Sequence, residues 1–267
     1  RDLTELGHDN EIDYLGMTIQ ADDEGSIIID NDRAAAKMVE HWELTGCNTT
    51  KRPIMKELLG IMTDEVERGE LLEAAESTKY QAGVGELNWL AQTTHPDLSV
   101  AVSLLGSFNS HPPASGLKAI KHAMRYVAGT VGQRLKTNRN PAQGLFVASD
   151  SDWAGMHSHM KTTRSRGGFV ATYAGMPVAY KTFWESERLS SAEAELFAAS
   201  EAAKMGLHLQ YVAEELFGLP ATEVIVYVDS SAAIAHATNT SSPGRMKHID
   251  QRDNWLRLLK DTTRLRL

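Results

Sequence analysis

The order of the elements expected after Pro141 constrains the fold more than any other feature of the chain. Three β-prone runs, a long helical run, a fourth β-prone run and two shorter helical runs follow one another there: 145–149, 168–173, 177–181, 191–217, 224–228, 231–238 and 249–260. Strands and helices in this order predict an α/β fold in which helices flank a mixed sheet. The last five residues alternate polar or basic with apolar side chains, as the opening of another strand would.

The residues before Pro141 predict a different architecture. Two short β-prone runs at 14–19 and 25–29 predict a hairpin, with Ala21–Glu24 as its turn. Helical patterns follow, interrupted at His95-Pro96 because proline breaks a helix, and the acidic stretch 60–76 is expected to be a solvated linker or a loose helix. The expected helices are 32–46, 80–92, 97–109 and 114–128.

Charge divides the chain into three segments, which we predict to be domains. Residues 1–76 carry 7 basic and 19 acidic residues, residues 77–142 carry 7 and 2, and residues 143–267 carry 13 and 14. The net charge of −8 therefore comes from the first segment and does not exclude nucleic acid as a partner. Cys47 is the only cysteine, which excludes an internal disulfide or a cysteine-based zinc site. No apolar run is long enough to cross a bilayer, and we expect no membrane association.

Candidate catalytic residues come from the last segment. Asp150 ends the first expected strand and Asp229 ends the fourth, where the sheets of α/β proteins bind ligands. Ser190 and Glu193 have the capping-box spacing, which assigns Glu193 to the start of the helix. Two positions further along a helix, the side chain is rotated by about 200°. Glu195 is therefore the acid that we expect beside the buried stripe of the helix.

Three carboxylates in one α/β core repel one another unless a cation neutralises them. Oxygen ligands without a thiolate favour Mg²⁺, with Mn²⁺ as an alternative. Two such ions can activate a water and stabilise the leaving oxygen of a phosphodiester. The acids of this segment thus indicate metal-dependent phosphoryl transfer. The competing interpretation is structural: Asp150 and Asp229 end strands as capping or turn residues, and Glu195 is a solvated acid in the first helical turns.

Basic residues share one face of the helix expected over 114–128. Lys118, Lys121, His122 and Arg125 recur at i, i+3, i+4 and i+7. This face is either the solvated side of an amphipathic helix or a surface for nucleic acid. His157 and His159 have no second pair of ligands, which argues against zinc.

Four motifs of the last segment, taken together, resemble the RNase H domain of copia-type (Ty1/copia) retrotransposon reverse transcriptases. They are Ser149–Gly155, Ser190–Glu195, Val228–Ile234 and Lys247–Asp250. Upstream, Tyr14–Met17 resembles the family's segment after the polymerase palm. Val84–Ala91, His95–Asp97 and Arg125–Thr130 resemble its thumb and connection region. The resemblance covers nearly the whole chain in the family's order.

The resemblance implies an RNase H fold that cleaves the RNA strand of an RNA–DNA hybrid with two Mg²⁺ ions. Asp150, Glu195 and Asp229 match the family's metal-binding acids, whereas Asp152 is offset from the first of them. Hybrids are read through shape, phosphates and the 2′-OH. The implied backbone contacts are Lys118, Lys121, Arg125, Lys161, Arg164 and Arg166.

The same resemblance predicts the domains and the cellular setting. Residues 1–76 are expected to end the palm and enter a thumb-like segment, 77–142 to be connection-like, and 143–267 to be an RNase H-like domain lacking its C-terminal end. The implied partners are the hybrid and the palm and fingers of the same polyprotein. The location is expected to be intracellular, either in a cytoplasmic virus-like particle or in the nucleus.

Departures from the family pattern leave alternatives open. The family's fourth metal-site Asp is expected after Leu267 and the polymerase Asp-Asp pair before Arg1, so we expect no DNA synthesis by this chain. Asp250 is a candidate fourth acid, and His248 and Asp250 are otherwise candidates for supporting the last helix. One alternative is a non-catalytic module that binds nucleic acid or protein. Another is a DDE-type transposase or integrase, which the order Asp, Glu, Asp disfavours because the DDE glutamate follows both aspartates.

Overall fold

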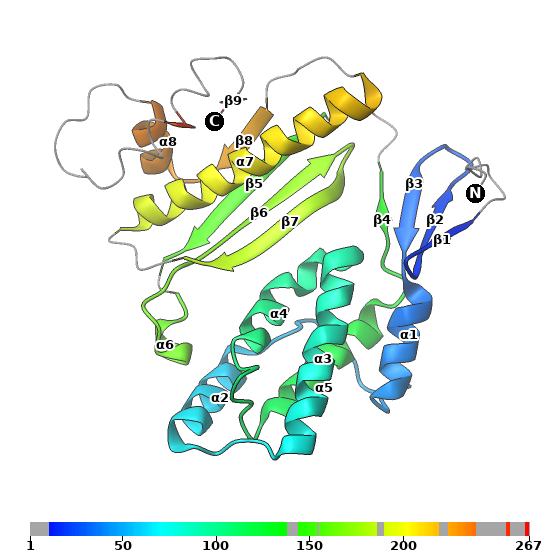
Figure 1. Cartoon of the computed structure of the whole chain (residues 1–267), viewed down its shortest axis with the longest axis vertical. Coiled ribbons are helices and arrows are strands. Elements are labelled where there is room, and N and C mark those ends of the chain that lie inside the picture. The colour runs from blue at the N-terminus through cyan, green and yellow to red at the C-terminus, as the bar shows by residue number, and fades with distance from the viewer. Residues whose placement is uncertain are drawn as a thin grey trace. The chain divides into compact units, whose positions relative to one another are not determined.

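The protein consists of two compact units. The computed structural model describes residues 11–137, 144–153, 155–185, 190–218, 224–238, 255–256 and 265–266. The first unit comprises Arg1–Arg139 and Ser158–Lys161, and the second comprises Asn140–His157 and Thr162–Leu267. Figure 1 shows helices and a small sheet in the first unit, and a larger sheet crossed by one long helix in the second. The expected boundary at residue 76 falls within a helix, Ala74–Thr93, so the change in charge there does not coincide with the end of an element.

The small sheet of the first unit has four antiparallel strands in the order β1-β2-β3-β4, rather than the two of the expected hairpin. They are β1 (Ile12–Tyr14), β2 (Met17–Ala21), β3 (Ile27–Asp30) and β4 (Leu135–Lys136). Leu15 and Gly16, expected inside a strand, form the β1–β2 turn with φ of 52° and 81°. Positive φ at two successive positions is the geometry of a tight hairpin turn, which explains the glycine there.

Helices follow the first three strands in the first unit. They are α1 (Asp32–His41), α2 (Lys56–Arg68), α3 (Ala74–Thr93), the 3₁₀ turn η1 (Pro96–Leu98), α4 (Ser99–Gly106) and α5 (Gly116–Thr130). The break at Pro96 is confirmed. Helix α2 begins earlier than the acidic pattern indicated because Leu58, Leu59 and Met62 are buried on one side of it. It ends at Gly69, whose φ of 73° suits a helix C-cap.

Buried contacts hold α3 at the centre of these helices. The hydroxyl of Tyr80 donates a hydrogen bond of 2.7 Å to the Leu105 carbonyl. Gly83 leaves space for the side chains of Trp42 and Ile120, because a Cβ at this glycine would lie 2.7 and 2.6 Å from their nearest atoms. The packing around α3 therefore depends on a small residue facing α5.

The second unit contains a five-stranded mixed sheet in the order β7-β6-β5-β8-β9. Its strands are β5 (Phe146–Asp152), β6 (Arg166–Tyr173), β7 (Met176–Trp184), β8 (Val224–Val228) and β9 (Leu265–Arg266). Strands β5, β6 and β7 form an antiparallel meander, and β5, β8 and β9 run parallel. This is the RNase H-like mixed sheet that the sequence predicts, and the prediction is confirmed.

Helix α7 (Ser191–Phe217) follows β7 and precedes β8 in the sequence, and it crosses the sheet (Figure 1). Its apolar stripe packs on Val147, Phe169 and Val226 in one buried cluster. Gly206 permits a close approach, since a Cβ there would lie 2.4 Å from Val224 Cγ1. Two further helices are described: α6 (His157–Met160), most of which belongs to the first unit, and α8 (Ser231–Thr238) in the second.

Gly167 and Gly168 lie inside β6. They pair across the ladder with Ser151 and Asp150 of β5. The reason is steric, because a Cβ at Gly167 would lie 2.4 Å from Glu185 Oε1 and 2.7 Å from Phe183 Cε2. Gly167 thus leaves room for neighbouring side chains.

Candidate metal centre and basic surfaces

Asp150 and Asp229 are brought together by strand register. Strands β5 and β8 are parallel, and Ser149 pairs with Val228. Asp150 and Asp229 are the next residues along these two strands, so they reach the same edge of the sheet. Both carboxylates are exposed.

Glu195 reaches this edge from α7. The Ser190 hydroxyl accepts a hydrogen bond of 3.2 Å from the Glu193 N–H, which caps the helix. Glu193 is thereby in the first turn, and the 200° rotation between positions two apart places Glu195 on another side. Glu195 is only 6% exposed, and its neighbours Ala194 and Leu196 are also buried. The capping prediction is confirmed, and it explains which of the two acids faces the sheet.

Asp150, Glu195 and Asp229 form the acid cluster. Each offers one carboxylate oxygen, and these oxygens all lie within 4.8 Å of one another. Burial, with the nearby charges of Asp150 and Asp229, raises the pKa of Glu195 to about 7. Glu195 Oε2 is buried and has no hydrogen-bond partner among the described residues. An unpartnered buried oxygen beside two further carboxylates fits a hard divalent cation, which would neutralise the repulsion among them.

Two groups beside the acid cluster were not identified from the sequence. The Ser151 N–H donates to Asp150 Oδ1 at 2.9 Å, and its hydroxyl donates to Glu185 Oε1 at 3.1 Å. Glu185 follows β7 directly and is 1% exposed. An isolated acid after a strand has no sequence pattern that distinguishes it from a surface residue.

Arg164 and Arg166 lie against Trp184 in the second unit. The guanidinium carbons of Arg166 and Arg164 lie 4.0 and 5.7 Å from the centroid of the Trp184 ring. Arg166 is 8% exposed, and burial together with the charge of Arg164 lowers its pKa to about 10. Arg166 pairs in the ladder with Asp152, two residues from Asp150. Arg166 is therefore about two residues, or roughly 7 Å of strand, beyond Asp150.

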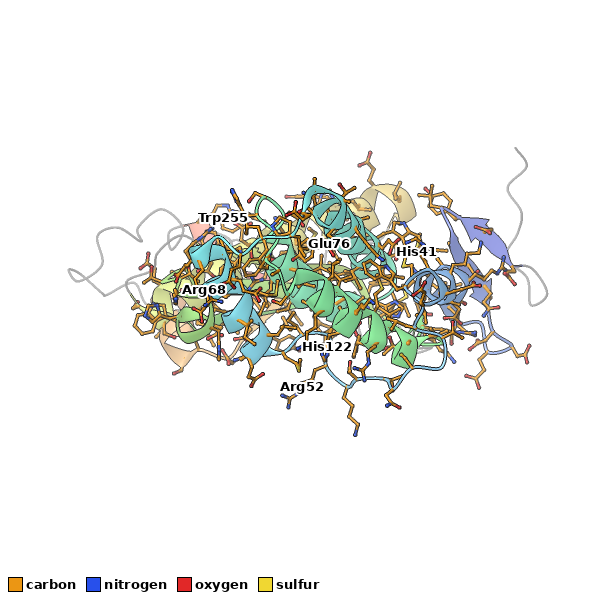
Figure 2. The ribbon with its side chains drawn as sticks, turned by 90° about the horizontal axis from the view of Figure 1, so that it is seen from below. His41, Arg52, Arg68, Glu76, His122 and Trp255 are labelled. Carbon is orange, nitrogen blue, oxygen red and sulfur yellow. The ribbon has the colours of Figure 1, made fainter. Side chains whose placement is uncertain are left out.

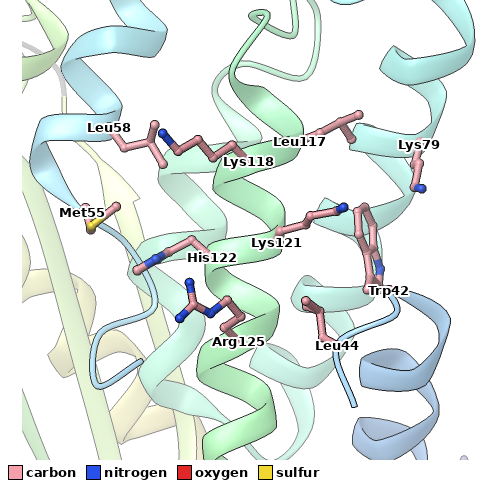
Figure 3. A pocket seen from close by; sticks show the side chains of 10 residues that line it. All are labelled: Trp42, Leu44, Met55, Leu58, Lys79, Leu117, Lys118, Lys121, His122 and Arg125. Atoms are coloured by element: carbon pink, nitrogen blue, oxygen red, sulfur yellow. The ribbon is translucent and has the colours of Figure 1, made fainter. Parts of the chain in front are cut away.

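Lys118, Lys121 and Arg125 line a groove of about 530 Å³ in the first unit, which we call the basic groove. Figure 3 shows their side chains extending from α5, with Lys79 on α3 at one end. No acidic residue is among those that line it, and its apolar lining is Trp42, Leu44, Met55, Leu58 and Leu117. The basic face predicted for this helix thus borders a concave surface.

Some of the groove's polar groups already have backbone partners. Arg125 Nε donates to the Asn48 carbonyl at 2.5 Å. His122 Nε2 lies 2.9 Å from the Arg52 carbonyl, and the two residues are neighbours in Figure 2. Lys79 Nζ lies 5.3 Å from the centre of the Trp42 ring. These contacts tie α5 to the chain after α1, and they leave Lys118 and Lys121 exposed at the groove.

Lys161 does not join these sites. Lys161 is counted with the first unit, where its ammonium lies 2.8 Å from Asp64 Oδ1 and 2.5 Å from Glu67 Oε2. These ion pairs raise the pKa of Lys161 and make it a poorer candidate for a phosphate contact. His248 and Asp250 lie outside the described residues. No described helix combines the length and the apolar character that a bilayer-crossing helix needs.

Comparison with known proteins finds relatives among retrotransposon proteins. The chain is 27% identical over its whole length to a retrovirus-related Pol polyprotein from transposon TNT 1-94 of Nicotiana tabacum, covering 20% of that protein. It is 29% identical over 70% of its length to a transposon Ty5-1 protein of Saccharomyces cerevisiae, covering 59% of it. Over 64% of its length it is 31% identical to the Pol polyprotein from transposon RE1 of Arabidopsis thaliana, covering 12% of it. These relatives are proteins of copia-type retrotransposons, the family that the motifs resemble.

The similarity to these relatives confirms the family resemblance drawn from the motifs. The chain corresponds to part of a retrotransposon polyprotein related to reverse transcriptases and spans less than two thirds of the length of these relatives. No protein-family model matches it. A foamy viral protease-reverse transcriptase, solved in complex with an RNA/DNA hybrid, is 14% identical with a TM-score of 0.46, covering 96% of this chain and 28% of that one. So distant a likeness carries no argument about function.

Proposed function

We propose that this copia-type Pol segment is an RNase H-type endonuclease that hydrolyses the RNA strand of RNA–DNA hybrids. The observation that supports the proposal most strongly is the acid cluster, in which three carboxylate oxygens from β5, α7 and the end of β8 lie within 4.8 Å at one edge of an RNase H-like sheet. Phosphodiester hydrolysis needs charge neutralisation at this place, and the cluster has the ligands for it.

Asp150, Glu195 and Asp229 would hold two Mg²⁺ ions, which when bound activate a water and stabilise the leaving oxygen of the phosphodiester. The residues themselves have separable roles. Asp150 is oriented by the Ser151 N–H, and Asp229 stands at the end of a parallel strand, so both are preorganised by backbone. Glu195 is buried and carries a proton below pH of about 7, which a cation must displace.

Basic groups in each unit are proposed to bind the nucleic-acid backbone. Arg166 lies about two residues of strand beyond Asp150, and Arg164 lies with it against Trp184. Lys118, Lys121 and Arg125 line the basic groove. Cations that contact phosphates release counterions from nucleic acid, so their contribution falls with salt. The hybrid, together with the palm and fingers of the same polyprotein, is the partner that this proposal implies.

Cleavage of a hybrid labelled on either strand tests the proposal. With Mg²⁺, the parent protein should shorten the RNA strand and leave the DNA strand intact, and EDTA should stop the reaction. Asp150→Asn should lower the rate by at least about 100-fold, because it removes a negative ligand at the metal. Asp152→Asn, which changes an acid outside the cluster on the same strand, is the matched control.

Two outcomes would contradict the proposal. An Asp150→Asn protein that cleaves as fast as the parent would remove the acid cluster from the chemistry. A parent that binds the hybrid but never cuts it, with either Mg²⁺ or Mn²⁺, would make this segment a binding module instead.

A further inference from the structure

Glu185 is a buried acid that the proposed chemistry does not use directly. It follows Trp184 at the end of β7, is 1% exposed, and its backbone N–H donates to the Ser165 carbonyl at 2.9 Å. Burying a carboxylate is costly unless hydrogen bonds or charges compensate it. A residue held in this way next to an acid cluster therefore calls for a specific explanation.

Ser151 links Glu185 to the acid cluster. Its hydroxyl donates to Glu185 Oε1 at 3.1 Å, and its backbone N–H donates to Asp150 Oδ1 at 2.9 Å. Its backbone also interacts with Glu195 in a way that favours the charged carboxylate. The backbone of Ser151 thus interacts with Asp150 and Glu195 of the acid cluster. Its hydroxyl is held by Glu185, a carboxylate outside the cluster.

The sheet leaves space for this arrangement. Gly167 pairs with Ser151 across the β5–β6 ladder. A Cβ at Gly167 would lie 2.4 Å from Glu185 Oε1, so any other residue there would displace the glutamate from Ser151. The glycine, the serine and the glutamate come from three neighbouring strands or strand ends, and together they form one contact behind the acids.

We infer that Glu185, acting through Ser151, is a positioning residue for the metal-binding acids. By accepting the Ser151 hydroxyl it fixes the orientation of the Ser151 peptide, whose N–H directs the Asp150 carboxylate toward the cation. Outer contacts of this kind orient metal ligands and tune their affinity. Glu185 is not among the three acids whose oxygens approach within 4.8 Å, so its role is distinct from ligation. The inference rests on the proposed function of the acid cluster.

Calorimetric titration of Mn²⁺ into the full chain, without nucleic acid, tests the inference independently of cleavage. Ser151→Ala should weaken Mn²⁺ binding by about 10-fold to 100-fold, the range found for outer-shell partners. Glu185→Gln retains an amide oxygen that can accept a hydrogen bond from Ser151. Its loss of Mn²⁺ affinity should therefore be smaller than the loss in Glu185→Ala. Glu201→Gln, which changes an α7 acid paired with Lys204 at 2.5 Å, should bind like the parent.

A double-mutant cycle separates positioning from a general loss of structure. If Glu185 acts through Ser151, the Ser151→Ala/Glu185→Ala protein should bind Mn²⁺ no more weakly than the weaker single variant. Additive losses would overturn the inference, as would Ser151→Ala binding as tightly as the parent. Should Glu185→Ala fail to fold, Ser151→Ala and Glu185→Gln still decide the matter. A parent that binds no Mn²⁺ would instead overturn the proposed function itself.

Discussion

The two units present opposite charges at their best-defined surfaces. The acid cluster of the second unit holds three carboxylates with an unpartnered buried oxygen, whereas the basic groove of the first unit has no acid among its lining residues. The acids require a cation to offset their mutual repulsion. The basic residues are already partly held by backbone carbonyls and need only an anion at their exposed ends. The difference supports the proposal that the metal chemistry belongs to the second unit and that the basic groove of the first unit adds to hybrid binding.

The largest expected effect separates two glutamates on one helix. Glu195→Gln should lower hybrid cleavage by at least about 100-fold, because it removes a carboxylate from the metal site. Glu193→Gln changes an acid two positions away, in the first turn of α7, and should leave the rate within about threefold of the parent. Rates measured under single-turnover conditions check both variants. Equal losses in the two would break the assignment of Glu195.

Metal binding should depend on pH in a direction set by Glu195. Its pKa is raised to about 7, so the carboxylate is free above pH 7 and protonated below it. Each cation must then displace a proton, and the apparent Kd for Mn²⁺ should rise by up to about tenfold per pH unit as pH falls below 7. Calorimetry between pH 5.5 and about 8.5 measures this slope. An affinity independent of pH across that window would contradict the placement of Glu195 at the ion.

The basic groove should affect binding and leave metal affinity unchanged. We expect Lys118→Ala/Lys121→Ala to weaken hybrid binding by about 10-fold at moderate salt and to reduce the salt dependence by about one to two released counterions. Lys37→Ala, which removes an exposed charge on α1 away from the groove, is the control. Fluorescence anisotropy at several salt concentrations gives both quantities. A variant that binds Mn²⁺ more weakly but the hybrid as tightly as the parent would contradict the assignment of hybrid binding to the basic groove.

Matched glycines test whether the units are stabilised separately. Gly83→Ala places a Cβ 2.6 Å from Ile120 Cγ2 in the first unit, and Gly206→Ala places one 2.4 Å from Val224 Cγ1 in the second. Overpacking of this kind costs about 1–3 kcal/mol. Calorimetric unfolding should show each substitution lowering the stability of its own unit. A single transition lowered equally by both would indicate that the units unfold together.

The smallest effect concerns His95 in the first unit. Burial lowers its pKa from the usual 6.5, although the charges of Asp97 and Asp32 oppose this. The unfolded chain therefore binds a proton more readily, and stability is complete above pH 6.5 and falls as pH drops through the unfolded pKa. The expected loss is at most about 1.4 kcal/mol per pH unit. Denaturant unfolding at pH 5.5 and about 7.5, with His95→Gln as comparison, measures it.

Local signals made much of the second unit predictable. The capping residue Ser190 and the glycine at 218, which adopts the αL conformation, bound α7. A run of mostly β-branched residues marks β8. Asp150 and Asp229 were identified because the sequence predicts them at strand ends. Asp229 does follow β8 directly, whereas β5 continues beyond Asp150 to Asp152 because the pairing with β6 extends that far. Glu195 was identified because a capped neighbour excluded Glu193. Their roles as ligands, and the expected domain assignments, stay predictions.

Long-range contacts made other features unpredictable. Strand β4 is two residues long and pairs with Ile28 and Ile29, more than 100 positions earlier in the chain. The need for glycine at position 167 could not be predicted, because it depends on Glu185, which follows the next strand. Glu185 itself shows no periodicity or motif. In each case a partner distant in sequence, rather than a local preference, decides the structure.

Replacing the whole acid cluster tests the central claim most directly. The protein with Asp150→Asn, Glu195→Gln and Asp229→Asn should be assayed for cleavage of the RNA strand with Mg²⁺ and, separately, for hybrid affinity in EDTA. We predict no cleavage above background and a Kd within about threefold of the parent, because binding depends on basic residues that remain. Cleavage that survives the triple substitution would contradict the account.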